Sequence, residues 1–229
     1  MKSKDYHYYR YLQTSEVGQE TARAHREIVA DYFWKILDNH GCRDILDVGC
    51  GLGVFLGKVK QGINAVGIDS NMYIVEHCRK DGRKIILGNG AELPLREGVM
   101  DGIHCAHLLE HLHDPEKALL EYHRVLRKGG LLVVRVPPFD ASFYDDWSHV
   151  RPFTGKSLRR LAAVAGFENI RVFYYHYDLP FRHWQRPLSR IVNTVRHLPV
   201  IRPTIDGLIK FYGLPPKELV LVAQKSSRR

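Results

Sequence analysis

The strongest constraint on the fold is the regular alternation of strand-like and helix-like segments between residues 45 and 136. Short apolar runs are separated by stretches with helical spacing, and glycine, proline or asparagine mark the boundaries. The pattern predicts strands at 45–48, 65–68, 84–87, 102–106 and 131–136, and helices at 71–80 and from Asp114-Pro115 to a stop at Gly129. Strands and helices that alternate in this way form a parallel sheet covered on both faces. The sequence therefore predicts an α/β protein with a Rossmann-like core.

Three alternating glycines, Gly49, Gly51 and Gly53, follow the first expected strand and precede a short expected helix. Glycines at this spacing allow the backbone to turn tightly and to approach a ligand closely. The third glycine comes one position earlier than in the dinucleotide pattern GxGxxG. Asp47 would repel a pyrophosphate but can hold an ammonium group, and Asp69 ends the second strand, where an acid accepts hydrogen bonds from ribose hydroxyls. These residues predict a nucleoside ligand that carries an amino acid.

We divide the chain into four parts: an N-terminal helical lid (1–40), the cofactor-binding core (41–177), a basic insert (178–217) and the last strand with the tail (218–229). A helix is expected from Ser15 to Asn39, another from Thr154 to Ala165, and a strand at 170–177. The insert is far longer than a usual connection and carries seven basic and two acidic side chains. We interpret it as a substrate cover, an amphipathic helix on a membrane or an anion-binding surface, with an ordinary packed helix as the alternative.

The net charge of +9 favours an anionic partner, such as nucleic acid, an acidic membrane or a phosphorylated or carboxylated small molecule. A basic host proteome is an equally good explanation. No apolar run reaches the ~18 residues of a membrane-spanning helix, and the first residues lack the pattern of a signal peptide. The four cysteines have no CxxC spacing, which argues against a zinc or redox motif. We expect a cytoplasmic protein, with or without peripheral contact between the insert and the inner face of the membrane.

Five motifs in succession resemble those of class I S-adenosylmethionine-dependent methyltransferases. They are Asp47-Val-Gly-Cys-Gly-Leu-Gly53, Gly67-Ile-Asp69-Ser, Gly88-Asn-Gly-Ala-Glu-Leu-Pro94, Leu109-Glu-His-Leu-His-Asp-Pro115 and Leu126-Arg-Lys-Gly-Gly-Leu-Leu132. The match covers residues 43–137 and is closest to the group that includes the quinone-biosynthesis methyltransferases. It implies a seven-stranded, mostly parallel sheet whose last strand, at 218–224, is antiparallel. It also implies an enzyme that uses S-adenosylmethionine and releases S-adenosylhomocysteine.

The resemblance assigns cofactor contacts position by position. The loop at 47–53 would surround the methionine part, Asp69 would bind the ribose, and the loop at 89–91 would flank adenine. The residues so assigned are Asp47, Gly49, Cys50, Gly51, Gly53, Asp69, Ser70, Asn89, Gly90, Ala91, His107 and Leu108. The last two follow the fourth strand, where the family places residues close to the sulfonium. The family commonly has aspartate in place of Asn89, so we expect weakened but retained adenine binding.

Methyl transfer from a sulfonium requires chiefly that nucleophile, methyl carbon and sulfur be held in line, which lowers the barrier by roughly 7–11 kcal/mol. The displacement needs no metal, and none is expected. A base is needed only if the acceptor must lose a proton. His149, which follows the aromatic segment 143–147, is the first candidate and His111 the second, with an ordinary surface or core histidine as the alternative for either. Glu110 and His111, with His107, also resemble divalent-metal ligands reported for some quinone-ring O-methyltransferases, where an acid replaces His107.

We favour an enzyme that methylates a small-molecule or lipid-like acceptor, anionic in character, at oxygen or carbon. An RNA methyltransferase is the alternative on the same fold. It lacks support because the chain has no Asn/Asp-Pro-Pro-Tyr motif, to which Val136-Pro-Pro-Phe139 is only superficially similar, and no added RNA-binding module. A non-catalytic binding or regulatory protein is the alternative from another class, and the intact Asp47 and Asp69 argue against it. The glycine spacing disfavours a nicotinamide oxidoreductase.

Overall fold

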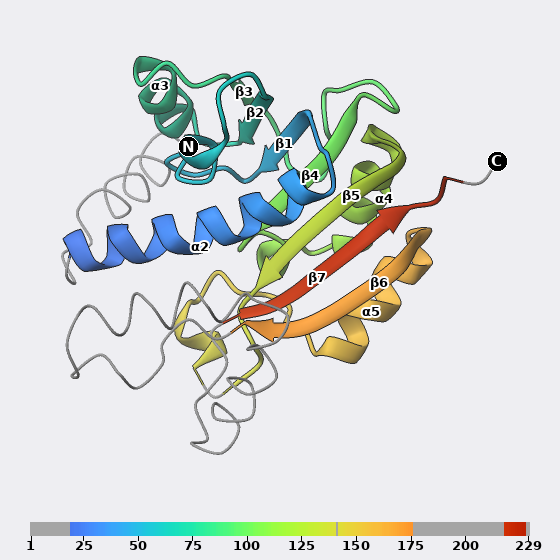
Figure 1. Ribbon diagram of the computed structural model, residues 1–229. Coiled ribbons are helices and arrows are strands. Elements are labelled where there is room, and N and C mark those ends of the chain that lie inside the picture. Colours follow the sequence, from blue (N-terminus) through green and yellow to red (C-terminus); the bar gives the residue numbers. More distant parts are fainter. Residues whose placement is uncertain (1–18, 141, 176–217, 228–229) are drawn as a thin grey trace, which may run out of the picture.

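The computed structural model of the chain describes residues 19–140, 142–175 and 218–227. The described residues form one seven-stranded sheet with the strand order β3-β2-β1-β4-β5-β7-β6 (Figure 1). Its strands are β1 (Asp44–Val48), β2 (Asn64–Asp69), β3 (Ile85–Leu87), β4 (Met100–Ala106), β5 (Leu126–Val136), β6 (Phe167–Tyr175) and β7 (Glu218–Lys225). The first five are parallel, and β7 runs antiparallel to β5 and β6. The predicted Rossmann-like sheet and its antiparallel last strand are confirmed.

Helices cover both faces of this sheet. They are α2 (Gln19–Asn39), α3 (Met72–Lys80), α4 (Pro115–Val125) and α5 (Gly155–Val164), with 3₁₀ turns η1 (Leu56–Lys58), η2 (Leu109–His111) and η3 (Phe143–Asp145). In Figure 1, α2 crosses one face of the sheet, and α4 and α5 lie on the other. Neighbouring residues of β1 belong to different cores: Ile45 packs with α2, and Leu46 packs with α4 and α5. Alternation along a strand therefore produces two cores from one sheet.

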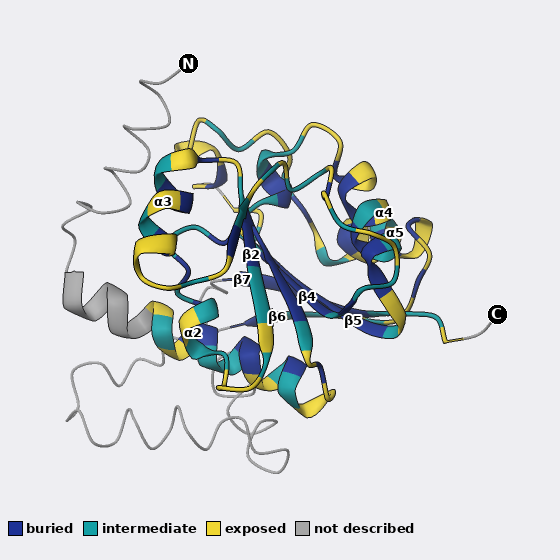
Figure 2. Ribbon diagram, turned by 90° about the horizontal axis from the view of Figure 1, so that it is seen from above, coloured by how far each residue is buried: buried dark blue, intermediate teal, exposed yellow. Residues whose placement is uncertain are grey.

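The central strands are buried on both sides. Six consecutive residues of β5, from Leu131 to Val136, are buried, and Figure 2 shows buried residues concentrated on the middle strands. On one face, α2 contributes Phe33, Trp34 and Leu37, each at most 2% exposed. Complete burial of a side chain of this size stabilises the fold by about 2–3 kcal/mol. This core fixes the positions of the strand ends that carry the site.

Side chains at the starts of the helices explain where the helices begin. Asn71 accepts hydrogen bonds from the backbone N–H groups of Tyr73 and Ile74 at the start of α3. Asp114 accepts one from Lys117, and Pro115 occupies the first turn of α4. Thr154 forms a reciprocal capping box with Ser157 at the start of α5. These contacts satisfy N–H groups that have no partner within the helix, and they confirm the predicted boundaries at Asp114 and Thr154.

Two predicted boundaries are wrong. The helix expected after the glycine loop is only the single turn η1, because Gly53 has φ +69° and Val59 is already extended. Gly129 does not end α4, since the helix stops at Val125 and Leu126 pairs with Met100 as the first residue of β5. Gly129 has φ +77° and lies inside that strand. At Leu126 the pairing of strands overrides the local helix signal.

Other expectations fall partly outside the described residues. Ser15 and the insert at 178–217 are outside them, so the lid, the amphipathic helix and the division into four parts stay predictions. All four cysteines are buried and unpaired with one another, as expected for small hydrophobic residues. Within the described ranges, no helix has the length and apolar character needed to cross a membrane.

Candidate active site

The candidate site lies at the carboxyl ends of the parallel strands. β1 is hydrogen-bonded to β2 on one side and to β4 on the other. The chain runs outward from β1 through β2 to β3 and then returns to β4, so the strand order reverses between β1 and β4. Where the strand order reverses, the loops that follow the two neighbouring strands run to opposite faces of the sheet. Ligands of such sheets bind in the crevice between these two loops. The predicted site residues are gathered on these loops.

The glycine loop after β1 has a backbone that only glycine adopts readily. Gly49, Gly51 and Gly53 have φ values of +70°, +50° and +69°, in the left-handed region. The N–H groups of Gly49 and Cys50 bond to the carbonyl of Ile68, which ties the loop to β2. A Cβ atom added to Gly51 would meet no atom of the described residues within 4 Å. At Gly51 the loop therefore presents bare backbone to a space that these residues leave open.

Cys50 differs from its neighbours in the loop. Its side chain is 8% exposed and packs in a small core with Ile74, Val75, Cys78 and Ile85. Burial, with help from neighbouring carboxylates, raises the pKa of its thiol far above the ordinary range. The buried thiol with its raised pKa is therefore not a nucleophile, and a cofactor contact by Cys50 stays a prediction.

Asp69 ends β2 beside this loop. One carboxylate oxygen accepts a hydrogen bond from the N–H of Gly51 at 3.0 Å, and the other accepts one from the N–H of Asn71 at 2.9 Å. Burial raises the pKa of Asp69, and the hydrogen bonds from Asn71 and Gly51 partly oppose that rise. Each oxygen keeps acceptor capacity for a further donor. The carboxylate is thus fixed in orientation, while the neighbouring Ser70 is exposed.

The loop after β3 closes the other side of the crevice. The side-chain oxygen of Asn89 accepts a hydrogen bond from the N–H of Ala91 at 2.9 Å. A Cβ atom on Gly90 would lie 2.7 Å from Leu108 and 2.9 Å from Val48, so only glycine fits there. A Cβ on Gly49 would also touch Leu108, at 3.4 Å. Leu108 therefore packs between the glycine loop and the loop after β3, and it holds the two loops apart.

Asp47 is placed differently from the other predicted contacts. It is 3% exposed and lies 2.7 Å from Nδ1 of His104, which is also buried and stacks on Phe55 with ring centroids 3.9 Å apart. Burial lowers the pKa of His104 despite the opposing effect of Asp47, so the neutral ring donates its Nδ1 proton to the carboxylate. Nε2 of His104 has no hydrogen-bond partner within the described part of the chain. The pair joins the neighbouring strands β1 and β4.

His107 is held between two buried carboxylates. Its Nδ1 lies 3.3 Å from Glu110 and its Nε2 lies 3.2 Å from Glu218, while Arg135 donates two hydrogen bonds to Glu218. Burial alone would lower the pKa of His107, but the two carboxylates outweigh it and raise the pKa to about 9. The ring is therefore an imidazolium, and its side chain is 45% exposed. His107 also has φ +52°, a strained conformation for a residue with a Cβ.

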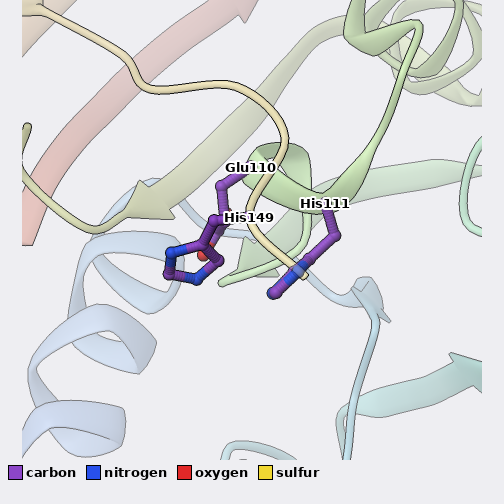
Figure 3. A group of neighbouring side chains, drawn as sticks. All are labelled: Glu110, His111 and His149. Carbon is purple, nitrogen blue, oxygen red and sulfur yellow. The ribbon is translucent and has the colours of Figure 1, made fainter. Parts of the chain in front are cut away.

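The two candidate bases, His111 and His149, lie next to each other. Their ring centroids are 4.8 Å apart, and Figure 3 shows them with Glu110, which precedes His111 on η2. Nδ1 of His149 lies 2.6 Å from the carbonyl oxygen of Phe143, and Nδ1 of His111 lies 3.2 Å from that of Ser148. Both contacts fix the rings in place. The structure brings the two predicted histidines together from separate loops.

The aromatic segment 143–147 has a divided role. Phe143 is 2% exposed and packs against His149 with ring centroids 4.6 Å apart, so it supports the histidine. Tyr144 and Trp147 are 60% and 86% exposed. The structure therefore gives Phe143 a supporting position beside His149, and the two exposed rings face away from the core.

Two residues of the site were missed in the sequence. Arg135 and Glu218 are buried on neighbouring strands and pair across 83 residues of chain. Arg135 was the detectable one, because a charge inside the apolar run 131–136 must find a buried partner. Glu218 had no comparable signal, since a polar residue at the start of a strand is common.

Comparisons with known proteins agree with this geometry. The sequence model of a methyltransferase domain matches residues 46–134. The chain is 31% identical over 140 residues to a probable S-adenosylmethionine-dependent methyltransferase of Mycolicibacterium smegmatis, covering 56% of this chain and 54% of that one. It is 32% identical over 125 residues to 24-methylenesterol C-methyltransferase 2 of Oryza sativa subsp. japonica, covering 50% and 33%.

The structural comparison concerns the fold. A SAM-dependent methyltransferase from Archaeoglobus fulgidus superposes with a TM-score of 0.66 and 21% identity, covering 87% of this chain and 94% of that one. The chain spans about half the length of the first curated relatives that it matches, 49% and 54%. The matched relatives thus share the core and extend beyond it.

Proposed function

The chain carries a class I methyltransferase domain of the S-adenosylmethionine-dependent family, and from this premise we propose that it methylates a small-molecule or lipid-like acceptor. The observation that carries the proposal is the carboxylate of Asp69, fixed by two backbone N–H groups beside the open space over Gly51. A carboxylate at the end of β2 can accept hydrogen bonds from ribose hydroxyls, and the glycine loop leaves room for a small polar group joined to that ribose.

The residues present fit the cofactor that the family uses. The ribose hydroxyls would donate to Asp69, and the adenine would lie against the loop of Asn89 and Gly90, where Leu108 excludes water from one side. The methionine part would follow the glycine loop, with the buried Asp47 supplying negative charge near its ammonium group. When bound, S-adenosylmethionine supplies an activated methyl group. The protein then has mainly to hold the acceptor in line with it.

We propose that His149 and His111 act on the acceptor when it must lose a proton. Each ring keeps Nδ1 at a backbone carbonyl oxygen, which leaves Nε2 as the acceptor atom of the neutral ring. His149 is the more enclosed candidate, with a side chain 14% exposed. The displacement itself needs no metal.

The character of the acceptor is inferred from charge, from one relative and from the two histidines. The net charge of +9 supports an anionic acceptor, and the half-exposed imidazolium of His107 adds a positive charge at the crevice. The rice relative is named a sterol C-methyltransferase, which supports a lipid-like acceptor methylated at carbon, whereas the paired histidines support methylation at oxygen. Peripheral contact with a membrane through 178–217 rests on the sequence of that segment.

Calorimetric titration with S-adenosylhomocysteine tests the cofactor. We expect micromolar binding, equivalent to about −8 kcal/mol, and no binding of NAD. Asp69→Ala should abolish binding, whereas Asp31→Ala, which removes an exposed carboxylate on α2, should not change it. Absence of binding to the wild-type chain, or binding of NAD in its place, would contradict the proposal. The acceptor can then be sought by detecting S-adenosylhomocysteine formation across hydroxyl, carboxylate and sterol compounds.

A further inference from the structure

Three potential metal ligands from two separate loops meet beside the crevice. Glu110 and His111 lie on η2 after β4, and His149 lies on the loop that follows β5 (Figure 3). One carboxylate oxygen of Glu110 and one nitrogen of each ring lie within 4.8 Å of one another. Glu110 is completely buried and both histidines are half-buried. The cluster is therefore enclosed on the protein side and reachable from outside.

The hydrogen bonds around the two rings fix their tautomers. A carbonyl oxygen can only accept, so Nδ1 of His149, 2.6 Å from the carbonyl of Phe143, carries the proton. The same holds for Nδ1 of His111 against the carbonyl of Ser148 at 3.2 Å. The hydroxyl of Ser148 gives its own proton to Asp146 at 2.6 Å, so it too can only accept from His111. In its neutral form, each ring therefore presents an unprotonated Nε2.

The remaining member, Glu110, has one charged neighbour. Nδ1 of His107 lies 3.3 Å from one carboxylate oxygen of Glu110, and His107 is shared with Glu218. Neither buried oxygen of Glu110 makes a well-formed hydrogen bond among the described residues. Nε2 of His149 lies 3.8 Å from Asp146, beyond hydrogen-bond distance. A cation bound between Glu110 and the two rings would satisfy these acceptor groups.

We propose that Glu110, His111 and His149 bind a divalent transition-metal ion. Two imidazole nitrogens and one carboxylate form a ligand set that suits zinc, iron, manganese or cobalt. Metal-binding histidines commonly donate their second ring N–H to a backbone carbonyl, as both rings do here. His107 is not a ligand, because its two ring nitrogens face Glu110 and Glu218. The ligand set therefore differs from the one that the sequence resemblance indicated, and it departs from the expectation of no metal. An ion bound here would occupy Nε2 of both rings, so the base role proposed above for His149 and His111 belongs to the metal-free site.

The ion would leave coordination positions open toward the crevice. Three protein ligands leave room for water or for an oxygen atom of the methyl acceptor. Assigning that oxygen to the acceptor rests on the proposed function, whereas metal binding does not. Ligands at about 2.0–2.2 Å from one ion lie roughly 3–3.5 Å apart. The three ligand atoms, which lie within 4.8 Å of one another, would therefore come closer by about an ångström when the ion binds.

Metal titration of the full chain tests this inference without any acceptor. The protein is purified without a histidine tag, stripped with a chelator and titrated with Zn²⁺, Mn²⁺ and Co²⁺. Calorimetry gives the stoichiometry, and visible absorption of the Co²⁺ form reports the ligand geometry. We expect one ion per chain for at least one metal. Glu110→Gln and His149→Asn should each weaken that binding at least 100-fold and change the Co²⁺ spectrum.

The control variant is His113→Asn, which removes an exposed histidine two residues from His111 and should bind as the wild type does. Equal binding by all four proteins, or no binding by the wild type, would overturn the proposal. Titration of each variant with S-adenosylhomocysteine shows that it is folded. The same titration separates the two proposals, because loss of cofactor binding in the wild type would contradict the proposed function and leave the metal site standing.

Discussion

Replacing Gly51 with alanine, with Gly62→Ala as the control, distinguishes two effects of an added methyl group: steric exclusion of the cofactor and strain of the backbone. Gly51 has φ +50°, and a Cβ atom there would meet no atom of residues 19–140, 142–175 and 218–227 within 4 Å. Gly62, in the exposed turn before β2, has φ +88°, and a Cβ atom there would likewise meet none of these residues within 4 Å. The two substitutions therefore impose similar strain and no clash with the described residues. They differ in that only the added methyl group of Gly51→Ala would occupy the proposed cofactor space.

The expected magnitudes follow from that difference. A residue with a Cβ in the left-handed region costs about 1–2 kcal/mol, so each variant should lower the melting temperature by roughly 2–8 °C. A methyl group forced into a close-fitting site costs about 1–3 kcal/mol more. Gly51→Ala should therefore bind S-adenosylhomocysteine about 10- to 100-fold more weakly. Gly62→Ala should bind it as the wild type does.

Thermal unfolding and calorimetric titration of both variants measure the two effects separately. The reasoning is refuted if Gly51→Ala keeps wild-type affinity, because the space over Gly51 would then not be the cofactor site. It is equally refuted if both variants lose affinity to the same degree, since strain alone would then explain the loss.

Three further predictions concern charged groups in and near the site. Because the pKa of Asp69 is raised, its carboxylate becomes protonated at a higher pH than that of an ordinary aspartate, and affinity for S-adenosylhomocysteine should fall early as the pH is lowered. Calorimetry at several pH values checks this, and a constant affinity down to about pH 4 would contradict it. Arg135 and His107 lower the pKa of Glu218 from 4.5 to about 2, so this group contributes about 3 kcal/mol of stability above pH 4.5 that is lost as the pH falls toward 2. Glu218→Gln should remove the pH dependence of the free energy of unfolding, measured with denaturant, over that range. An unchanged pH dependence would show that the Arg135–Glu218 pair adds no stability. The stability contribution of His107 depends on pH in the opposite direction, since the pKa of His107 rises from 6.5 to about 9. This contribution is complete below pH 6.5 and is lost as the pH rises through 9. His107→Gln should remove that loss, and the same alkaline decline in the variant would count against the imidazolium.

Much of the fold could be predicted because its signals are local. The strands at 45–48 and 131–136, and the helix starts at Asp114 and Thr154, depend on residues within a few positions of one another. Predictions failed where a distant segment decided the outcome. Leu126 continues as a strand because Met100 pairs with it, although its own neighbours favour a helix that runs to Gly129.

The cofactor side of the candidate site was also predicted largely from local pattern. Asp69 and the three glycines are each recognisable within one strand–loop–helix unit, because the backbone conformation they require is set by their own residue types. Asp47 was recognised as well, but not its partner. His104 looked like an ordinary strand residue in the sequence, and only the register between β1 and β4 places it 2.7 Å from that carboxylate.

The sequence by itself determined the parallel sheet, the glycine loop, the acid at the end of β2 and the class of cofactor. The tertiary structure alone decided how the charged and titratable groups are paired. His107 meets Glu218 across 111 residues of chain, and Glu110 and His149 converge from different loops. Such contacts depend on strand order, register and side-chain direction together, and no local pattern encodes these. Local residue types set the backbone conformation, whereas the charge of a buried group depends on neighbours that the completed fold supplies.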